Sequence, residues 1–174
     1  MLGLGSRYRK LVYGVLRCAR EADIYQSACV LIRRDATDFR TPTMPIISVT
    51  RLHLRSIRFF PGFLWYTRRS IRQAKRTPGN LGVRVRKTRG LAFWTLAIWR
   101  DNQAIRAFVP ASPHKEAMQK LPHWCDEAAF ADWEQDTADW PSWETATKKL
   151  VATGRLVDVL HPSERQKAGL IETS

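Results

Sequence analysis

The sequence predicts an α+β protein whose sheet and helices follow the order strand, helix, strand, strand, helix, strand. Three observations carry this prediction. Residues alternate between two faces from Ile46 to Leu54, which is the two-residue period of a strand. The saturated apolar run 91–99 is long enough for a buried strand and too short for a membrane span. Helical spacing of apolar residues fills 62–76 and 101–110.

The first helix is predicted from about Gly62 to Arg76, and turn residues at 77–80 end it. Alternation of apolar with basic residues from 81 to 86 predicts the second strand, and the turn at 88–90 leads into the third strand. The helix is amphipathic. Leu64, Ile71 and Ala74 can face inward, while Arg68, Arg69, Arg72 and Lys75 face outward.

Asp101 is predicted to cap the helix at 101–110, because its carboxylate can accept hydrogen bonds from the backbone N–H groups of the first turn. A shorter helix at about 113–122 and a last strand at 127–135 complete the order. This is the ferredoxin-like split βαβ arrangement, βαββαβ. Both faces of Phe93–Ile98 are apolar, so we expect the sheet of a second subunit to cover one of them and predict a homodimer.

Three parts are expected along the chain: an N-terminal extension at 1–43, the ferredoxin-like domain at 44–136 and a C-terminal helical extension at 137–174. Two interpretations of residues 1–43 stay open. The first is a loosely attached tail or annotation extension, with Met44 as the true translation start, and the second is the transit peptide of an organelle-targeted protein. Three cysteines without metal-type spacing favour a reducing compartment, and we expect the cytoplasm.

The positive charge is concentrated in one block. Residues 51–90 contain twelve Lys and Arg and no Asp or Glu, within a net charge of +13 for the whole chain. Such a block can bind phosphate, an anionic membrane surface or an acidic patch of a partner. No recognised nucleic-acid reader motif accompanies it, so nucleic-acid binding is not predicted.

The run FWTLAIWRDNQAIRAF…SPHKEAM, from Phe93 to Met118, resembles the second half of the antibiotic biosynthesis monooxygenase-like proteins, and more closely the branch related to spheroidene monooxygenase. The resemblance extends from about Met44 to about Trp143. It implies a dimeric α/β barrel and an oxygenase for a polycyclic or polyene substrate. In cofactor-free relatives the substrate forms a stabilised carbanion and gives an electron to oxygen, whereas haem-degrading relatives use a His as axial ligand. His114 would be the base or the ligand in these cases. We expect no cofactor, with haem as the alternative.

We expect a pocket between the helices and the sheet, because aromatic side chains with a few polar groups suit a flat hydrophobic ligand. His114 is the candidate catalytic residue, with hydrogen bonding to its own helix as the other interpretation. The candidate substrate-binding residues are Phe93, Trp94, Trp99, Phe108 and His53.

Three of these candidates carry a restriction. Trp94 and Trp99 point to opposite faces of their strand, so at most one of them lines a given pocket. His53 has Arg51 and Arg55 as alternate neighbours, which indicates a solvated position. No metal site is predicted, since His-x-Cys at 123–125 has no companion ligands.

The predicted function is a monooxygenase-like protein that acts on or binds a flat hydrophobic small molecule. No phosphate loop, nucleophile elbow, HExxH helix or dinucleotide fingerprint occurs in the sequence, which argues against hydrolase, kinase and classical dehydrogenase activities. The alternative is a non-catalytic protein that uses the basic block 51–90 to associate with an anionic membrane surface or an acidic partner.

Overall fold

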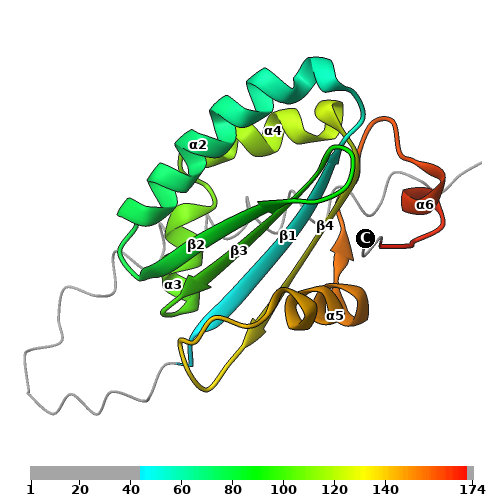
Figure 1. Cartoon of the computed structure of the whole chain (residues 1–174). Coiled ribbons are helices and arrows are strands. Elements are labelled where there is room, and N and C mark those ends of the chain that lie inside the picture. Colours follow the sequence, from blue (N-terminus) through cyan, green and yellow to red (C-terminus); the bar gives the residue numbers. More distant parts are fainter. Residues whose placement is uncertain (1–43, 172–174) are drawn as a thin grey trace, which may run out of the picture. The chain divides into compact units, whose positions relative to one another are not determined.

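A computed structural model describes residues 44–171 (Figure 1). The N-terminal extension at 1–43, with both of its interpretations, lies outside the described residues. The elements in chain order are β1 (Ile46–Leu54), a 3-10 turn (Ile57–Phe59), α2 (Phe60–Arg76), β2 (Asn80–Lys87), β3 (Ala92–Trp99), α3 (Asn102–Phe108), α4 (His114–Trp124), β4 (Cys125–Glu134), α5 (Trp143–Thr153), β5 (Arg155–Leu156) and α6 (Glu164–Lys167).

The sheet has the order β2-β3-β1-β4-β5, and all neighbouring strands are antiparallel. Its first four strands, with α2 and the α3–α4 pair as crossovers, form the predicted ferredoxin-like βαββαβ arrangement, which is therefore confirmed. The short strand β5 is an addition, in which Leu156 pairs with Ala129 and Arg155 pairs with Phe130.

Helix starts follow the caps in the sequence. Oδ1 of Asp101 accepts a hydrogen bond from the backbone N–H of Ala104 at 2.8 Å, which confirms the predicted N-cap of α3. Oγ of Ser142 accepts from the N–H of Thr145 at 3.0 Å and caps α5 in the same way. Gly79 has a φ of 87°, and a Cβ there would come within 2.7 Å of the Cβ of Ala104, so the turn between α2 and β2 requires glycine.

Helices α2, α3 and α4 cover one face of the sheet (Figure 1), which we call the helix face. Two apolar clusters fill the space between the layers. The first consists of Ile46, Ala74, Ala97, Trp99 and Ala104, with Val83, Ile105 and Phe108 packed against it. The second consists of Leu54, Phe63, Leu121, Cys125 and Ala128, with Phe93 among the residues packed against it.

Helix α5 packs on the opposite face, which we call the α5 face. Its Ala146 and Leu150 are fully buried against alternate residues of β1, β3 and β4. The sequence predicts that a second subunit covers this face, yet Trp94 is 0% exposed within a single chain. The C-terminal extension therefore covers a face of the sheet that the sequence analysis expected a second subunit to cover. The homodimer itself stays a prediction, since one chain does not test it.

No helix in residues 44–171 is both long and apolar enough to cross a membrane.

Candidate functional site

Three of the predicted site residues form a continuous aromatic row on the helix face. Trp99 ends β3, Phe108 ends α3 and His114 begins α4, so the strand-turn-helix sequence brings them together. The ring centroids of Trp99 and Phe108 are 5.0 Å apart, and those of Phe108 and His114 are 4.3 Å apart. Trp99 is 3% exposed, whereas Phe108 and His114 are half-buried. The row thus leads from the core to a half-buried imidazole.

The imidazole of His114 is held by hydrogen bonds. Its Nδ1 lies 3.1 Å from the backbone oxygen of Val109. A carbonyl oxygen only accepts, so Nδ1 carries the proton and Nε2 keeps its lone pair. The backbone N–H of His114 donates to Oε1 of Gln73 at 2.8 Å, and Nε2 of Gln73 donates to the carbonyls of Phe108 and Ala111. Gln73 of α2 therefore fastens the loop between α3 and α4.

The protonation state of His114 follows from its surroundings. Burial lowers the pKa of His114 below the ordinary value of 6.5, while the hydrogen bond to Val109 opposes part of that shift. The imidazole is consequently neutral at neutral pH. A neutral, oriented imidazole with a free Nε2 can accept a proton from a bound molecule.

The remaining candidates lie elsewhere. Phe93 shares the helix face, but its ring packs with Phe63 at 4.9 Å, in the second of the two clusters. Trp94 lies on the α5 face, which agrees with the prediction that it and Trp99 point to opposite faces. The candidate residues therefore lie in separate regions of the protein and do not line the single pocket that the sequence predicts.

His53 lies at the far end of β1 from the aromatic row, where it pairs with Ala92, while Ile46 pairs with Trp99. Its Nδ1 is 2.6 Å from Oδ1 of Asp126, and 29% of its side chain is exposed. The solvated position expected for His53 is therefore partly correct, but its acidic partner, 73 residues away in the sequence, could not be read from local alternation.

Sequence reasoning missed a buried ion pair beside this end of the sheet. Nη1 of Arg51 donates to Oε2 of Glu127 at 2.7 Å, with side-chain exposures of 2% and 9%. Oγ of Ser163 donates to the other carboxylate oxygen at 2.8 Å. Arg51 is therefore not a solvated neighbour of His53. The alternation in β1 could have indicated that Arg51 is buried, because it shares a face with Ile47 and Val49, which are fully buried.

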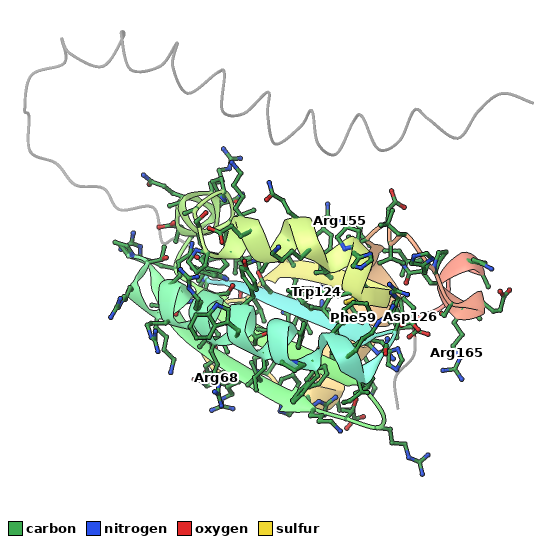
Figure 2. The ribbon with its side chains drawn as sticks, turned by 90° about the horizontal axis from the view of Figure 1, so that it is seen from above. Phe59, Arg68, Trp124, Asp126, Arg155 and Arg165 are labelled. Carbon is green, nitrogen blue, oxygen red and sulfur yellow. The ribbon has the colours of Figure 1, made fainter. Side chains whose placement is uncertain are left out.

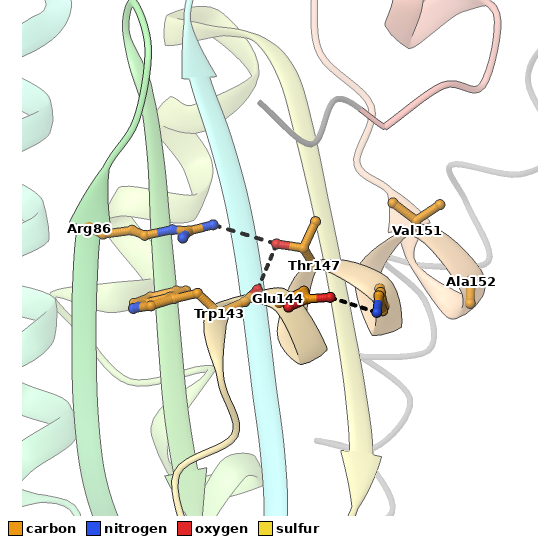
Figure 3. A pocket seen from close by; sticks show the side chains of 7 residues that line it. Arg86, Trp143, Glu144, Thr147, Val151 and Ala152 are labelled. Atoms are coloured by element: carbon orange, nitrogen blue, oxygen red, sulfur yellow. Dashed lines mark hydrogen bonds and ion pairs between the residues drawn. The ribbon is translucent and has the colours of Figure 1, made fainter.

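A second feature missed from the sequence is an open depression of about 580 Å³ between β2 and α5 (Figure 3). The guanidinium of Arg86 lies over the rings of Trp94 and Trp143, at 5.1 and 4.4 Å from their centroids. Its Nη2 donates to Oγ1 of Thr147 at 3.5 Å. The lining residues are Arg86, Trp143, Glu144, Thr147, Lys148, Val151 and Ala152.

The basic block forms an exposed surface on α2. Arg68 projects outward from this helix (Figure 2), and Trp65 beside it is 61% exposed. The guanidinium of Arg69 lies 5.8 Å from the Trp65 ring centroid. The exposed basic residues of α2 are Arg68, Arg69, Arg72, Lys75 and Arg76.

Residues 44–171 form neither a metal centre nor a reactive thiol. No three His, Cys, Asp or Glu side chains of this part gather where they could hold a metal ion. Cys125 is fully buried, and burial together with the charge of Asp126 raises its thiol pKa to about 12. The thiol is thus a packing group rather than a nucleophile.

A family described as a domain of unknown function (DUF3291) matches residues 50–155. No curated protein matches the chain. Similar solved structures include a conserved protein from Methanosarcina mazei Go1, with 14% identity, 54% of this chain and 95% of that chain covered, and a TM-score of 0.49. They include SnoaB, a cofactor-independent oxygenase from Streptomyces nogalater, with 15% identity and a TM-score of 0.47; the match covers 57% of this chain and 99% of that chain. A third, an antibiotic biosynthesis monooxygenase, has 10% identity, 53% and 97% covered, and a TM-score of 0.46. These neighbours include proteins of the kind that the sequence resembles.

Proposed function

The chain belongs to the DUF3291 family, and we propose that it is a monooxygenase-like protein that acts on a flat hydrophobic molecule, polycyclic or polyene, with His114 as the base. One observation carries the proposal. A neutral imidazole, oriented by the backbone oxygen of Val109, stands at the half-buried end of the row formed by Trp99 and Phe108. Gln73 holds the backbone of His114. Aromatic rings favour a flat apolar ligand, and the imidazole supplies one proton acceptor beside it.

The proposed chemistry needs only the substrate and oxygen. Nε2 of His114 takes a proton from an activated CH₂ group of the substrate, and the carbanion reduces O₂ and forms a C–O bond. The imidazolium then returns its proton to the peroxide anion, which gives a hydroperoxide. Loss of water from the resulting hydroperoxide leaves a carbonyl, so one oxygen atom enters the product and the other leaves as water. The low pKa of His114 keeps the imidazole available as a base at neutral pH.

Oxygen uptake with anthrone as the probe tests this proposal, because anthrone has an acidic CH₂ group and gives anthraquinone and water. Wild-type protein should consume oxygen faster than buffer does, and His114→Gln should lower the rate by roughly 10²-fold or more. His123→Gln, which removes the other imidazole of α4, is the matched control and should keep the rate. Equal rates in all three proteins would reject the role of His114.

Haem is the alternative to cofactor-free chemistry, and the absorption spectrum distinguishes the two. In the proposal, haem added to the purified protein gives no Soret band that depends on His114. A Soret band in the wild type that moves in His114→Gln would instead assign the imidazole as an axial ligand. Oxygen uptake and the spectrum thus separate the two roles of one residue.

The exposed basic face of α2 supports a second candidate function, association with an anionic membrane surface. Five basic side chains and the indole of Trp65 are exposed together, a pattern of helices that lie in a membrane interface. The other interpretation is an ordinary core helix with a solvated charged face. Partners with an acidic patch would use the same charges.

Sedimentation with vesicles tests this candidate. Vesicles of phosphatidylcholine and phosphatidylserine should bind the protein in low salt, and vesicles of phosphatidylcholine alone should not. The double variant Arg68→Glu/Arg72→Glu should lose this binding. Lys148→Glu/Lys149→Glu changes the charge equally on α5 and should retain it. Equal binding to both kinds of vesicle, or unchanged binding of the Arg68→Glu/Arg72→Glu variant, would reject the candidate.

A further inference from the structure

Arg86 is a half-buried cation without an acidic partner in the part of the chain that is described. The strand register places it opposite Trp94 in the β2–β3 pair, and Trp94 is opposite Arg51 on β1. Arg51 is paired with Glu127, whereas the side chain of Arg86 contacts two indole rings and the hydroxyl of Thr147. The burial that lowers the pKa of Arg86 is therefore not compensated by a carboxylate.

Two buried donors next to each other lack a hydrogen-bond partner among residues 44–171. They are Nε of Arg86 and Nε1 of Trp94, and Trp94 is 0% exposed. The hydroxyl of Thr147 donates to the backbone oxygen of Trp143 at 2.7 Å, so its lone pairs face Arg86 as an acceptor. Buried donors are normally satisfied. Of the two groups, Arg86 lines the depression, whereas Trp94 is fully buried and is not among its lining residues.

The depression in Figure 3 gives access to the guanidinium. Trp143, Val151 and Ala152 supply an apolar wall, and Val151 is 51% exposed. Lys148 also lines the depression, but its ammonium is paired with Glu144 at 2.7 Å. The charge left for a ligand is therefore that of Arg86, at one end of an apolar surface.

We propose that this depression is a binding site for an organic acid with an apolar body, whose carboxylate is held by Arg86 and whose body lies against Trp143 and Val151. A planar guanidinium matches the two oxygens of a carboxylate, and the indole of Trp143 offers the apolar body a flat surface. The site lies on the α5 face, whereas Trp99, Phe108 and His114 lie on the helix face. It is consequently separate from the proposed oxygenase site and does not depend on it.

Titration with 2-naphthoate, followed by the indole N–H signals of ¹⁵N-labelled full-length protein, tests the site. Signals are assigned with single Trp→Phe variants. The indole signals of Trp94 and Trp143 should shift saturably with 2-naphthoate, while that of Trp99 stays in place. The neutral amide 2-naphthamide should bind at least tenfold more weakly, because it lacks the negative charge that Arg86 requires.

Two variants and one control locate the binding. Arg86→Gln should weaken 2-naphthoate at least tenfold, but it also removes a contact of α5 and so can loosen the fold. Val151→Glu places a carboxylate at the exposed rim without disturbing the core and should weaken 2-naphthoate equally with an unchanged melting temperature. Thr145→Glu adds the same charge to α5 outside the depression, in a position that complements the Ser142 cap, and should bind like the wild type.

Three results would overturn the proposal. The first is the absence of saturable 2-naphthoate binding in the wild type, which would leave Arg86 as a contact that attaches α5. The second is equal affinity for 2-naphthoate and 2-naphthamide, which would show an apolar surface without charge recognition. The third is wild-type affinity in Val151→Glu, which would place the ligand elsewhere.

Discussion

The two faces of the sheet use the same strands in different ways. On the helix face, Trp99, Phe108 and His114 meet through contacts between neighbouring segments of the chain, from β3 to α4. On the α5 face, Arg51 is buried and paired with Glu127, and Arg86 contacts Trp143 and Thr147 of the C-terminal extension. Local sequence therefore organises the first face, and a segment distant in sequence organises the second.

This difference separates what each face can do. The helix face offers a half-buried neutral base beside aromatic rings, which suits chemistry on an apolar molecule. The α5 face offers guanidinium groups, one of them already paired with Glu127. The comparison predicts that changes on the α5 face affect stability most, and that changes at His114 affect function and pH dependence.

The largest effect is expected from Arg51→Met. It leaves the carboxylate of Glu127 buried with only the hydroxyl of Ser163 as a described partner, and it should lower the free energy of unfolding by about 3–5 kcal/mol. Urea unfolding measures the change. Arg51→Met/Glu127→Leu should recover a large part of the loss because no unpaired charge remains. A loss below about 1 kcal/mol in the single variant would contradict a buried pair.

A slightly smaller loss is expected from Leu150→Ala. Leu150 is 0% exposed and joins α5 to the sheet, so truncation should cost about 2–5 kcal/mol. Its neighbour Val151 is 51% exposed, and Val151→Ala should change stability by less than about 0.5 kcal/mol. Light scattering measures the oligomeric state of both variants alongside their stability. Equal stability of the two would show that α5 does not cover this face.

Much of the fold could be predicted from the sequence because its signals are local. Alternation locates β1 and β2, and the Asp101 cap marks the start of α3 after an apolar strand. The order of these elements then fixes the ferredoxin-like arrangement, since few topologies accommodate it. The aromatic row follows from the same local order, and all three of its members are among the predicted site residues.

The rest depended on contacts between distant segments. Glu127 neutralises Arg51 across 76 residues, and a basic residue in an alternating strand is read as solvated unless its partner is known. Trp140 lies directly over Gly82, where a Cβ would come within 2.5 Å of its ring, so a glycine in β2 makes room for the C-terminal extension. Neither relation has a local signal. The sequence predicts a C-terminal helical extension across the domain or its partner, and α5 is that helix. The packing of α5 on this particular face, and with it the Arg86 depression, could not be predicted.

The smallest effect concerns pH. Burial lowers the pKa of His114 in the folded state, so between that value and about 6.5 the unfolded chain binds more protons. The free energy of unfolding should therefore fall as the pH drops below about 6.5. In His114→Gln this contribution is absent, and the loss of stability between pH 7 and pH 5 should be smaller than in the wild type. Gln119→Ala, on the same helix, should keep the wild-type profile, and parallel curves for all three proteins would contradict the assignment.

The central claim is that a neutral flat ligand binds on the helix face, and indole N–H spectra of the protein titrated with anthraquinone test it most directly. Anthraquinone has no charge for Arg86, so the account predicts a saturable shift of the Trp99 signal with the Trp94 and Trp143 signals unchanged. His114→Gln should retain the Trp99 shift while losing oxygen uptake with anthrone. A shift of Trp94 and Trp143 with Trp99 unmoved, or no saturable shift at all, would contradict the account.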